Sequence, residues 1–161
     1  MTDGVIKRYE LTRTRDVLYD CISSNITDPL PTAEKRVAKS HWIKAGFPTK
    51  VGKLGTPAPE GWKFPIIVIP YSELDDENRV LDGSKSLITH SIPIEVHSRT
   101  RVQANELAEE IRNILKVTTQ DDLKKASLHG PDVISTTHDS DFIGGNKYYT
   151  VTIDYEFKRF D

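Results

Sequence analysis

The stretch that most constrains the fold is residues 87–115, which has the pattern of one strand followed by one amphipathic helix. Residues 87–98 alternate between apolar and polar side chains, as expected for a strand with one buried face. After a short connection, apolar side chains recur at helical spacing: Ala104, Leu107, Ala108, Ile111, Ile114 and Leu115. Each element can bury only one face, so we expect the strand and the helix to pack against each other.

Local features set the limits of this unit. Thr100 and Gln103 have the spacing of a capping box, so the helix should begin beside Thr100. Pro93 has no backbone N–H to donate, so the strand should be bulged, or lie at the edge of the sheet, near that residue.

The other periodic segments add helices and strands around this unit. Residues 10–27 place apolar side chains along one helical face and end at Asp28-Pro29. Residues 64–71 predict a strand with two apolar faces, because both sets of alternating side chains are apolar. Residues 148–158 alternate cleanly and are rich in aromatic and β-branched side chains, which predicts a further strand.

Shorter signals complete the topology. Thr119 and Asp122 predict a short capped helix that ends near Ala126. A short strand is expected at residues 133–137, followed by a polar turn that includes residues 138–141. The Gly-Gly-Asn turn at residues 144–146 should pair this strand with the last one. We therefore expect an α+β fold, with a mostly antiparallel sheet of about four to five strands and two long helices packed on one face.

We treat residues 1–161 as a single domain with two irregular insertions. Residues 31–63 are rich in Gly and Pro and predict a long loop. Residues 72–86 carry Glu73, Asp75, Asp76 and Glu77 and predict an acidic hairpin arm, with a solvated loop as the alternative. The loop aromatics Trp42, Phe47 and Trp62 either pin the loop to the core or anchor a neighbouring subunit.

Composition excludes several classes of function. A formal net charge of −2 disfavours a general nucleic-acid-binding role. No apolar run approaches the ~20 residues of a membrane span, and the first residues lack the apolar core of a signal peptide. Cys21 is the only cysteine, so we expect neither an intrachain disulfide nor a thiolate metal cluster.

The sequence has no motif that predicts catalysis. It has neither a HExxH zinc motif nor a nucleophile elbow, and Gly52–Gly55 lacks the Gly-Lys-Ser/Thr ending of a phosphate loop. His138, Asp139 and Asp141 could hold a metal ion, but carboxylates in turns more often accept local backbone hydrogen bonds. We therefore expect no enzymatic activity, no cofactor and no metal.

In this order, the elements resemble the tail terminator proteins of bacteriophages with long, non-contractile tails. The resemblance covers most of the chain as a pattern, although the Pro- and Gly-rich loop and the short helix near Thr119 depart from it. The segments that carry it are Phe64-Pro65, the acidic connection Glu73–Glu77, the strand Ile92–Val96 and the closing strand Tyr149–Phe157.

The resemblance implies a structural virion protein at the head-proximal end of the tail, present in the host cytoplasm during assembly. Such proteins form a hexameric ring on the last ring of tail tube protein and stop tube growth. They also present a surface to the head-completion, or neck, protein, while phage DNA passes through the lumen without specific binding. On this interpretation no membrane is involved.

The resemblance also suggests roles for individual residues. The acidic arm, with Glu73, Asp75, Asp76 and Glu77, would dock on the tube. Neighbouring subunits would be contacted by Trp42, Phe47, Trp62, Ile67 and Ile69. The alternatives are a neck protein, a small ligand-binding α+β domain and an enzyme without a recognisable motif.

Overall fold

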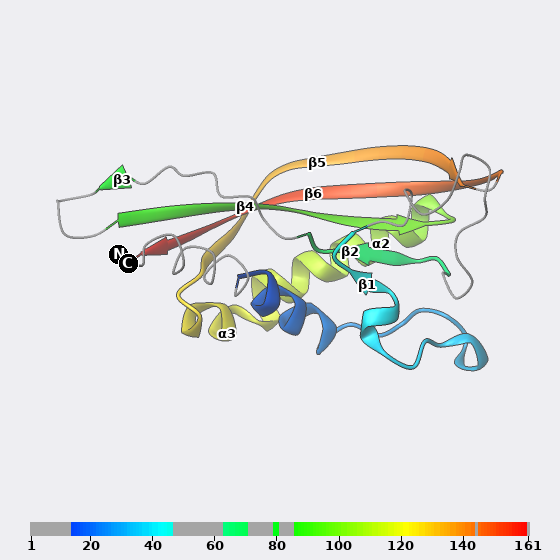
Figure 1. Ribbon diagram of the computed structural model, residues 1–161, viewed down its shortest axis with the longest axis horizontal. Coiled ribbons are helices and arrows are strands. Elements are labelled where there is room, and N and C mark those ends of the chain that lie inside the picture. The colour runs from blue at the N-terminus through cyan, green and yellow to red at the C-terminus, as the bar shows by residue number, and fades with distance from the viewer. Residues whose placement is uncertain (1–13, 47–62, 71–78, 81–85, 144, 161) are drawn as a thin grey trace.

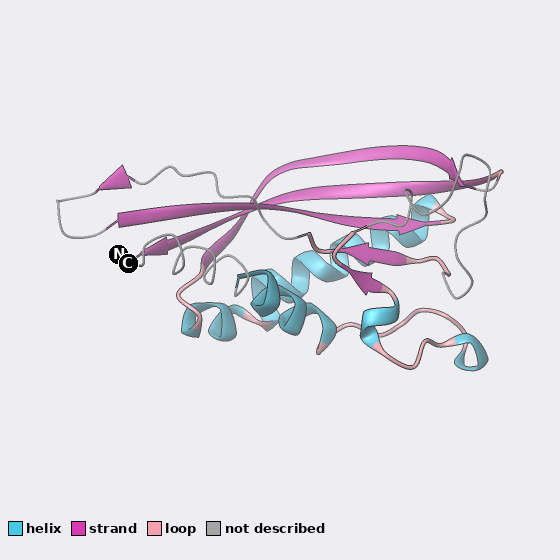
Figure 2. Cartoon of the chain, in the orientation of Figure 1, coloured by secondary structure: helices cyan, strands magenta, loops and turns pink. Residues whose placement is uncertain are grey.

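The computed structural model describes residues 14–46, 63–70, 79–80, 86–143 and 145–160. Its strands form one mixed, mostly antiparallel sheet, and its helices lie together on one side of that sheet (Figure 1, Figure 2). The chain is therefore α+β, as the sequence predicts.

Five strands follow one another in the order β1-β2-β4-β6-β5, and the short strand β3 pairs separately with the start of β4. Only β1 and β2 pair in parallel among the described strands. The strands are β1 (Ile43–Lys44), β2 (Ile66–Val68), β3 (Arg79–Val80), β4 (Ser86–Ser98), β5 (His129–Ile143) and β6 (Asn146–Phe160).

β4 and β6 pair without interruption from Leu87 opposite Phe160 to Ser98 opposite Tyr149. Pro93 therefore lies opposite Asp154 without a bulge on this side. On the other side, described strands pair only with residues 86–87 and 95–97 of β4. No described residue pairs with Pro93 on that side, and residues 71–78, which follow β2 in the chain, lie outside the described residues, so the edge position remains a prediction.

The expected polar turn at residues 138–141 is wrong, because β5 continues through it to Ile143. The two carboxylates that suggested a turn do accept local hydrogen bonds, from Ser140 N–H to Asp139 (2.7 Å) and from Phe142 N–H to Asp141 (2.8 Å). Pairing with the regular strand β6 nevertheless keeps this backbone extended, because ladder hydrogen bonds do not depend on side-chain type. The hairpin closes where Ile143 lies opposite Asn146, at the predicted Gly-Gly-Asn turn.

Within the described residues one helix is long, whereas the sequence predicted two; of the helix predicted at residues 10–27, the structure describes residues 14–23 as helical. Helix α2 (Arg101–Asn113) continues into the π-helical turn Ile114–Thr118, which gives 18 helical residues in all. The other described helices are shorter and comprise residues 14–23 and α3 (Gln120–Lys125), together with the single 3-10 turns η1 (Thr32–Glu34) and η2 (Lys39–His41).

Half of the predicted capping box is present at the start of α2. The Thr100 hydroxyl accepts a hydrogen bond from the Gln103 N–H at 3.2 Å. The Gln103 side chain does not return to Thr100; its oxygen accepts from the Ser98 hydroxyl at 2.5 Å. The cap therefore ties the helix to the last residue of β4 and fixes how the helix folds back onto the sheet.

The core lies between the helices and the sheet. Leu18 and Ile22 of the first helix and Ile111 of α2 are fully buried there. Ile66 and Ile67, adjacent residues of β2 whose side chains point to opposite faces, are also buried, as the doubly apolar pattern predicts. Sheet residues complete this core: Ile92, Ile94, Val96, Val151, Ile153, Tyr155 and Phe157.

Candidate assembly surfaces

The predicted inter-subunit residues lie mostly inside the chain's own core. Trp42 is 1% exposed, and Ile67 and Ile69 are completely buried, so they have no surface to offer a neighbouring subunit. Trp42 instead pins its segment to the core, which was the alternative interpretation of the loop aromatics. The remaining candidates lie outside the described residues: Phe47, Trp62, Glu73, Asp75, Asp76 and Glu77.

The possible metal ligands His138, Asp139 and Asp141 do not converge. They lie on strand β5, where successive side chains point to opposite faces, so His138 faces away from both aspartates. Within the part of the chain that the structure describes, no group of three or more His, Cys, Asp or Glu side chains could hold a metal ion.

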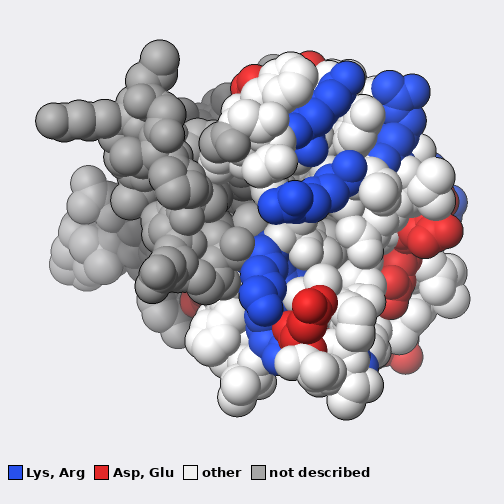
Figure 3. All heavy atoms as spheres, turned by 90° about the vertical axis from the view of Figure 1, so that its right-hand side faces the viewer, with Lys and Arg blue, Asp and Glu red and all other residues white. Residues whose placement is uncertain are grey.

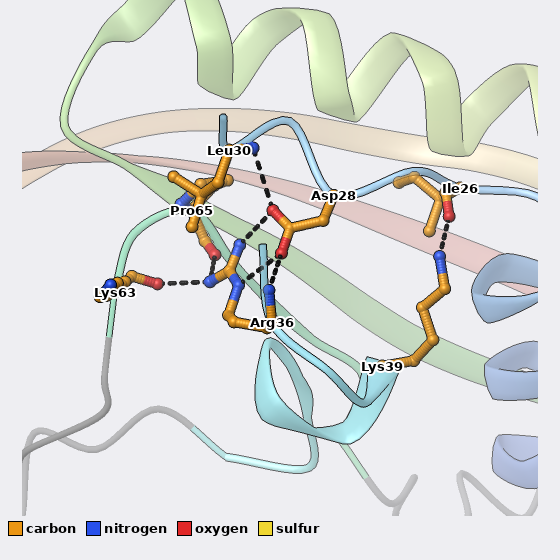
Figure 4. A network of polar contacts seen from close by, with 7 residues as sticks. All are labelled: Ile26, Asp28, Leu30, Arg36, Lys39, Lys63 and Pro65. Atoms are coloured by element: carbon orange, nitrogen blue, oxygen red, sulfur yellow. Dashed lines mark hydrogen bonds and ion pairs between the residues drawn. The ribbon is translucent and has the colours of Figure 1, made fainter. Parts of the chain in front are cut away.

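A buried ion pair joins the two ends of the segment predicted as a long loop (Figure 4). Arg36 donates from Nε and Nη2 to the two Asp28 carboxylate oxygens, both at 2.8 Å. It also donates from Nη1 to the carbonyl oxygens of Lys63 (2.5 Å) and Pro65 (2.7 Å). One guanidinium thereby holds the chain where it leaves the first helix and where it returns before β2.

Neighbouring groups support this pair. The Leu30 N–H donates to Asp28 at 3.1 Å, the Arg36 guanidinium lies 5.0 Å from the Trp42 ring centre, and the Lys39 ammonium donates to the Ile26 carbonyl. Burial of Asp28 would raise its pKa, but hydrogen bonds from Arg36 and Leu30 and the Arg36 charge lower that pKa to about 2. The sequence signalled only the local turn at Asp28-Pro29, because nothing in its spacing links Asp28 to Arg36.

A second series of hydrogen bonds joins β4 to β6 on the outer sheet face. His97 Nδ1 lies 2.8 Å from the Thr150 hydroxyl, and its Nε2 lies 3.1 Å from the Glu95 carboxylate. A hydroxyl, an imidazole and a carboxylate in this order resemble a nucleophile with its base. The imidazole is 5% exposed and its ring centre lies 5.9 Å from that of Tyr148, so the series fits a cross-strand link inside the packed sheet.

Strand β5 is mostly exposed, although Arg112 of α2 donates a hydrogen bond to the Thr136 hydroxyl at 3.4 Å. Helix α2 packs on β4 and β6, whereas the β5 side chains from residue 132 to residue 142 are all exposed. The apolar side chains Val133, Ile134 and Phe142 are among them. β5 is also the terminal strand, so its outer edge has no described partner. This strand offers both a main-chain edge and side chains to another molecule.

Positive charge collects at the end of the molecule where β4 finishes. We call Arg99, Arg101 and Lys147 the cationic end. The Arg99 guanidinium lies 5.8 Å from the Phe64 ring centre, and Arg101 and Lys147 each lie 5.4 Å from the Tyr149 ring centre. Figure 3 views the molecule from this end and shows a band of Lys and Arg side chains across the described surface.

A groove of about 390 Å³ lies between the first helix and α3. Its lining includes Asp20, Asp122 and Lys125, so it differs from the apolar pocket that a small-molecule binding domain would use. Cys21 also lines this groove, and burial raises the pKa of its thiol, which leaves it a poor nucleophile.

No described helix is both long enough and apolar enough to cross a membrane. Models of known protein families give no match to this chain, and curated proteins include no similar sequence.

Proposed function

We propose that this protein is the tail terminator of a long-tailed bacteriophage. In this role it caps the growing tail tube as a hexameric ring, stops tube polymerisation and forms the surface on which the neck proteins of the filled head dock. It acts through binding surfaces and needs neither catalytic residues nor a cofactor.

The observation that carries the proposal is the placement of the segments on which the resemblance rests. Phe64-Pro65 leads directly into β2, Ile92–Val96 lies within β4, and Tyr149–Phe157 lies within β6. These strands are consecutive neighbours in the sheet. Segments that are far apart in the sequence therefore form one continuous unit, which is what a shared fold would require.

The exposed strand β5 further supports an assembling protein. A monomer usually covers or interrupts a long edge strand, because an open edge pairs readily with other chains. Here the register is irregular only between His129 and Ser135, and from Thr136 to Ile143 the pairing with β6 is regular. A ring joined by heterologous contacts would use such an edge.

Electron microscopy of particles from the phage that encodes this protein, with the gene removed, tests the proposal. Overlong tail tubes without heads would support a terminator. Tails of normal length that fail to join filled heads would identify a neck protein instead. Intact infectious particles would refute both structural roles and favour the ligand-binding alternative.

A matched test in solution uses purified tail tube protein. The terminator should stop tube elongation when it is added at about one hexamer per tube end, because a ring that covers the end blocks the next addition. A control protein of similar charge should leave tube lengths unchanged. Tubes that keep growing in the presence of the protein would contradict the proposal.

A further inference from the structure

We propose that a hollow at the cationic end is an anion site that binds a phosphate group, with Arg101, His138 and Ser140 as its donors. The inference goes beyond the proposed function, which assigns this protein no ligand. It concerns a single phosphate group, whether that group belongs to a free phosphate compound or to a DNA backbone. Binding can be measured on the purified chain without any phage component.

The hollow has a volume of about 160 Å³ and lies where the start of α2 meets the β5–β6 hairpin. Its lining consists of Arg101, residues 138–140 of β5 and residues 149–151 of β6. It is therefore part of the end of the molecule that Figure 3 faces. Pockets that bury a drug-sized ligand have volumes of about 300–1,000 Å³, so this hollow suits a smaller group.

Strand register places two donor side chains on the side of the sheet where α2 lies. His138 is directly opposite Val151, which is a core residue. Thr136, two residues before it, accepts a hydrogen bond from Arg112 of α2. Alternate residues of a strand share a face, so His138 and Ser140 point to this same side. They lie about 7 Å apart along the strand, a distance that one phosphate can span with a hydrogen bond at each end.

The donors have no other described partner. Within the part of the chain that the structure describes, the side chains of Arg101, His138 and Ser140 take part in no hydrogen bond or ion pair, and all three residues are exposed. The Arg101 guanidinium lies 5.4 Å from the Tyr149 ring centre, which restricts it beside the hollow while its N–H groups can still donate. The Lys147 ammonium lies 5.4 Å from the same ring centre and adds positive charge nearby.

Negative charge beside the hollow does not neutralise these donors. Asp139 alternates with His138 and Ser140, so its side chain points to the opposite face of the sheet. Its carboxylate accepts a hydrogen bond from the Ser140 N–H at 2.7 Å. The first turn of α2 begins with Arg101 and contains no acidic residue. Arg101 and the hollow thus lack a counter-charge on the α2 side, which favours an anionic ligand there.

Phosphate is the anion that this donor set fits best. A guanidinium presents its N–H groups in a planar fork that binds two oxygens of one phosphate. The imidazole and the hydroxyl can donate to the remaining oxygens. A carboxylate has only two oxygens, so it would occupy the Arg101 fork and leave His138 and Ser140 without acceptors.

Two sources could supply such a phosphate. Contacts with the phosphates of a DNA backbone carry no sequence information, so the site is compatible with the passage of DNA of any sequence. Inorganic phosphate or a small phosphate compound is the other source. The donors would be the same in both cases, so binding of inorganic phosphate is the common test.

Isothermal titration calorimetry of the full chain with inorganic phosphate, at an ionic strength held constant with chloride, tests the site. One variant carries Arg101→Gln, and a second carries His138→Gln with Ser140→Ala. Arg101→Lys keeps the charge but removes the planar fork. The matched control is Lys124→Gln, which removes an exposed cation on α3.

We expect the wild-type chain and the Lys124→Gln control to bind one phosphate per chain, with saturation. Arg101→Gln should weaken binding at least about tenfold, because it removes the charge-assisted hydrogen bonds. Arg101→Lys should weaken it less, and the loss of both neutral donors should weaken it at least about threefold. Circular dichroism should show that each variant remains folded, since the altered side chains are exposed.

The inference would be overturned if the wild-type chain bound no phosphate, or bound it without saturation. Unchanged binding by Arg101→Gln, or an equal loss in Lys124→Gln, would also overturn it, because the phosphate would then lie elsewhere.

Fluorescence anisotropy with a short labelled DNA duplex distinguishes the two sources. A duplex that binds the wild-type chain, binds Arg101→Gln more weakly and is displaced by inorganic phosphate would support the site and identify the DNA backbone as its source. Phosphate binding without duplex binding would support the site and identify a free phosphate compound. Intact infectious particles after removal of the gene would refute the proposed function but leave a measured phosphate site standing.

Discussion

Replacing Asp28 by Asn tests whether one buried ion pair holds the two ends of the 31–63 segment together. Asn keeps the size of the side chain and can still accept from the Leu30 N–H, but it lacks the charge that faces Arg36. The Arg36 side chain is only 5% exposed, so its guanidinium would remain buried without a counter-charge. Breaking a buried pair in this way costs about 3–5 kcal/mol.

The pKa of Asp28 gives a separate measure of the same interaction. Burial opposes ionisation, yet hydrogen bonds, chiefly from Arg36, lower the pKa from 3.8 to about 2. That difference corresponds to about 2.5 kcal/mol of folding free energy near neutral pH. The two measures agree on a loss of about 3 kcal/mol for Asp28→Asn at about pH 7.

The pH dependence has a definite sign. The folded chain favours ionised Asp28, so the stabilisation is complete above the unfolded-state pKa and is lost as the pH falls from 3.8 towards 2. Urea denaturation monitored by tryptophan fluorescence should therefore give a difference between wild type and Asp28→Asn that shrinks over this interval.

Asp16→Asn is the matched control, because the Asp16 side chain is 56% exposed and lies 3.9 Å from Arg15. Its effect should stay below about 0.5 kcal/mol. The reasoning is refuted if Asp28→Asn costs less than about 1 kcal/mol at neutral pH, or if its cost is unchanged in acid.

Three further predictions concern the sheet and the core. Gly130 has φ +125°, and a Cβ at this position would lie 2.9 Å from the Glu156 carbonyl oxygen. Gly130→Ala should therefore lower the free energy of unfolding by about 2 kcal/mol, measured by urea denaturation. The control Gly46→Ala should not lower it, because a Cβ at Gly46 would have nothing within 4 Å. Ile111→Ala should lower the free energy of unfolding by about 2–5 kcal/mol, because Ile111 is completely buried. Val102→Ala, at an exposed site, should change it by less than about 0.5 kcal/mol. Equal effects of the two substitutions would contradict the described core. Burial raises the pKa of Tyr155 to about 12 although Arg112 partly lowers it, so the last tyrosinate absorbance step should appear near that pH and vanish in Tyr155→Phe. The stabilisation from neutral Tyr155 is present below pH 10 and is lost as the pH rises towards 12.

Regular, amphipathic parts of the fold could be predicted from the sequence. The alternating apolar and polar side chains of β4 and β6 indicate which of them face the core, and so do the apolar side chains at helical spacing on α2. In β2 both alternating sets are apolar, which indicates burial on both faces. These signals are local, so a single sequence carries them. They were sufficient for the α+β class and for the antiparallel pairing of the last two strands.

The errors arose where a distant partner decides the local structure. Residues 138–141 resemble a turn in composition, and only pairing with β6 makes them a strand. In the sequence alone, Trp42 looks like an aromatic residue of an interface. In the fold it is buried in the core and lies against the Arg36 guanidinium. The Asp28–Arg36 pair and the cationic end could not be predicted, since they depend on which segments the sheet brings together.

The long pairing of β4 with β6 has a consequence for how the chain reaches its fold. The β5–β6 hairpin closes at Ile143 and Asn146, so it can form from residues that are near neighbours in the sequence. β4 joins β6 only after α2 and α3 have been spanned, and closing so long a loop is entropically costly. We therefore expect the hairpin to form early and the docking of β4 to complete the core. Until that step, the edge of β6 that β4 later covers stays open to other chains.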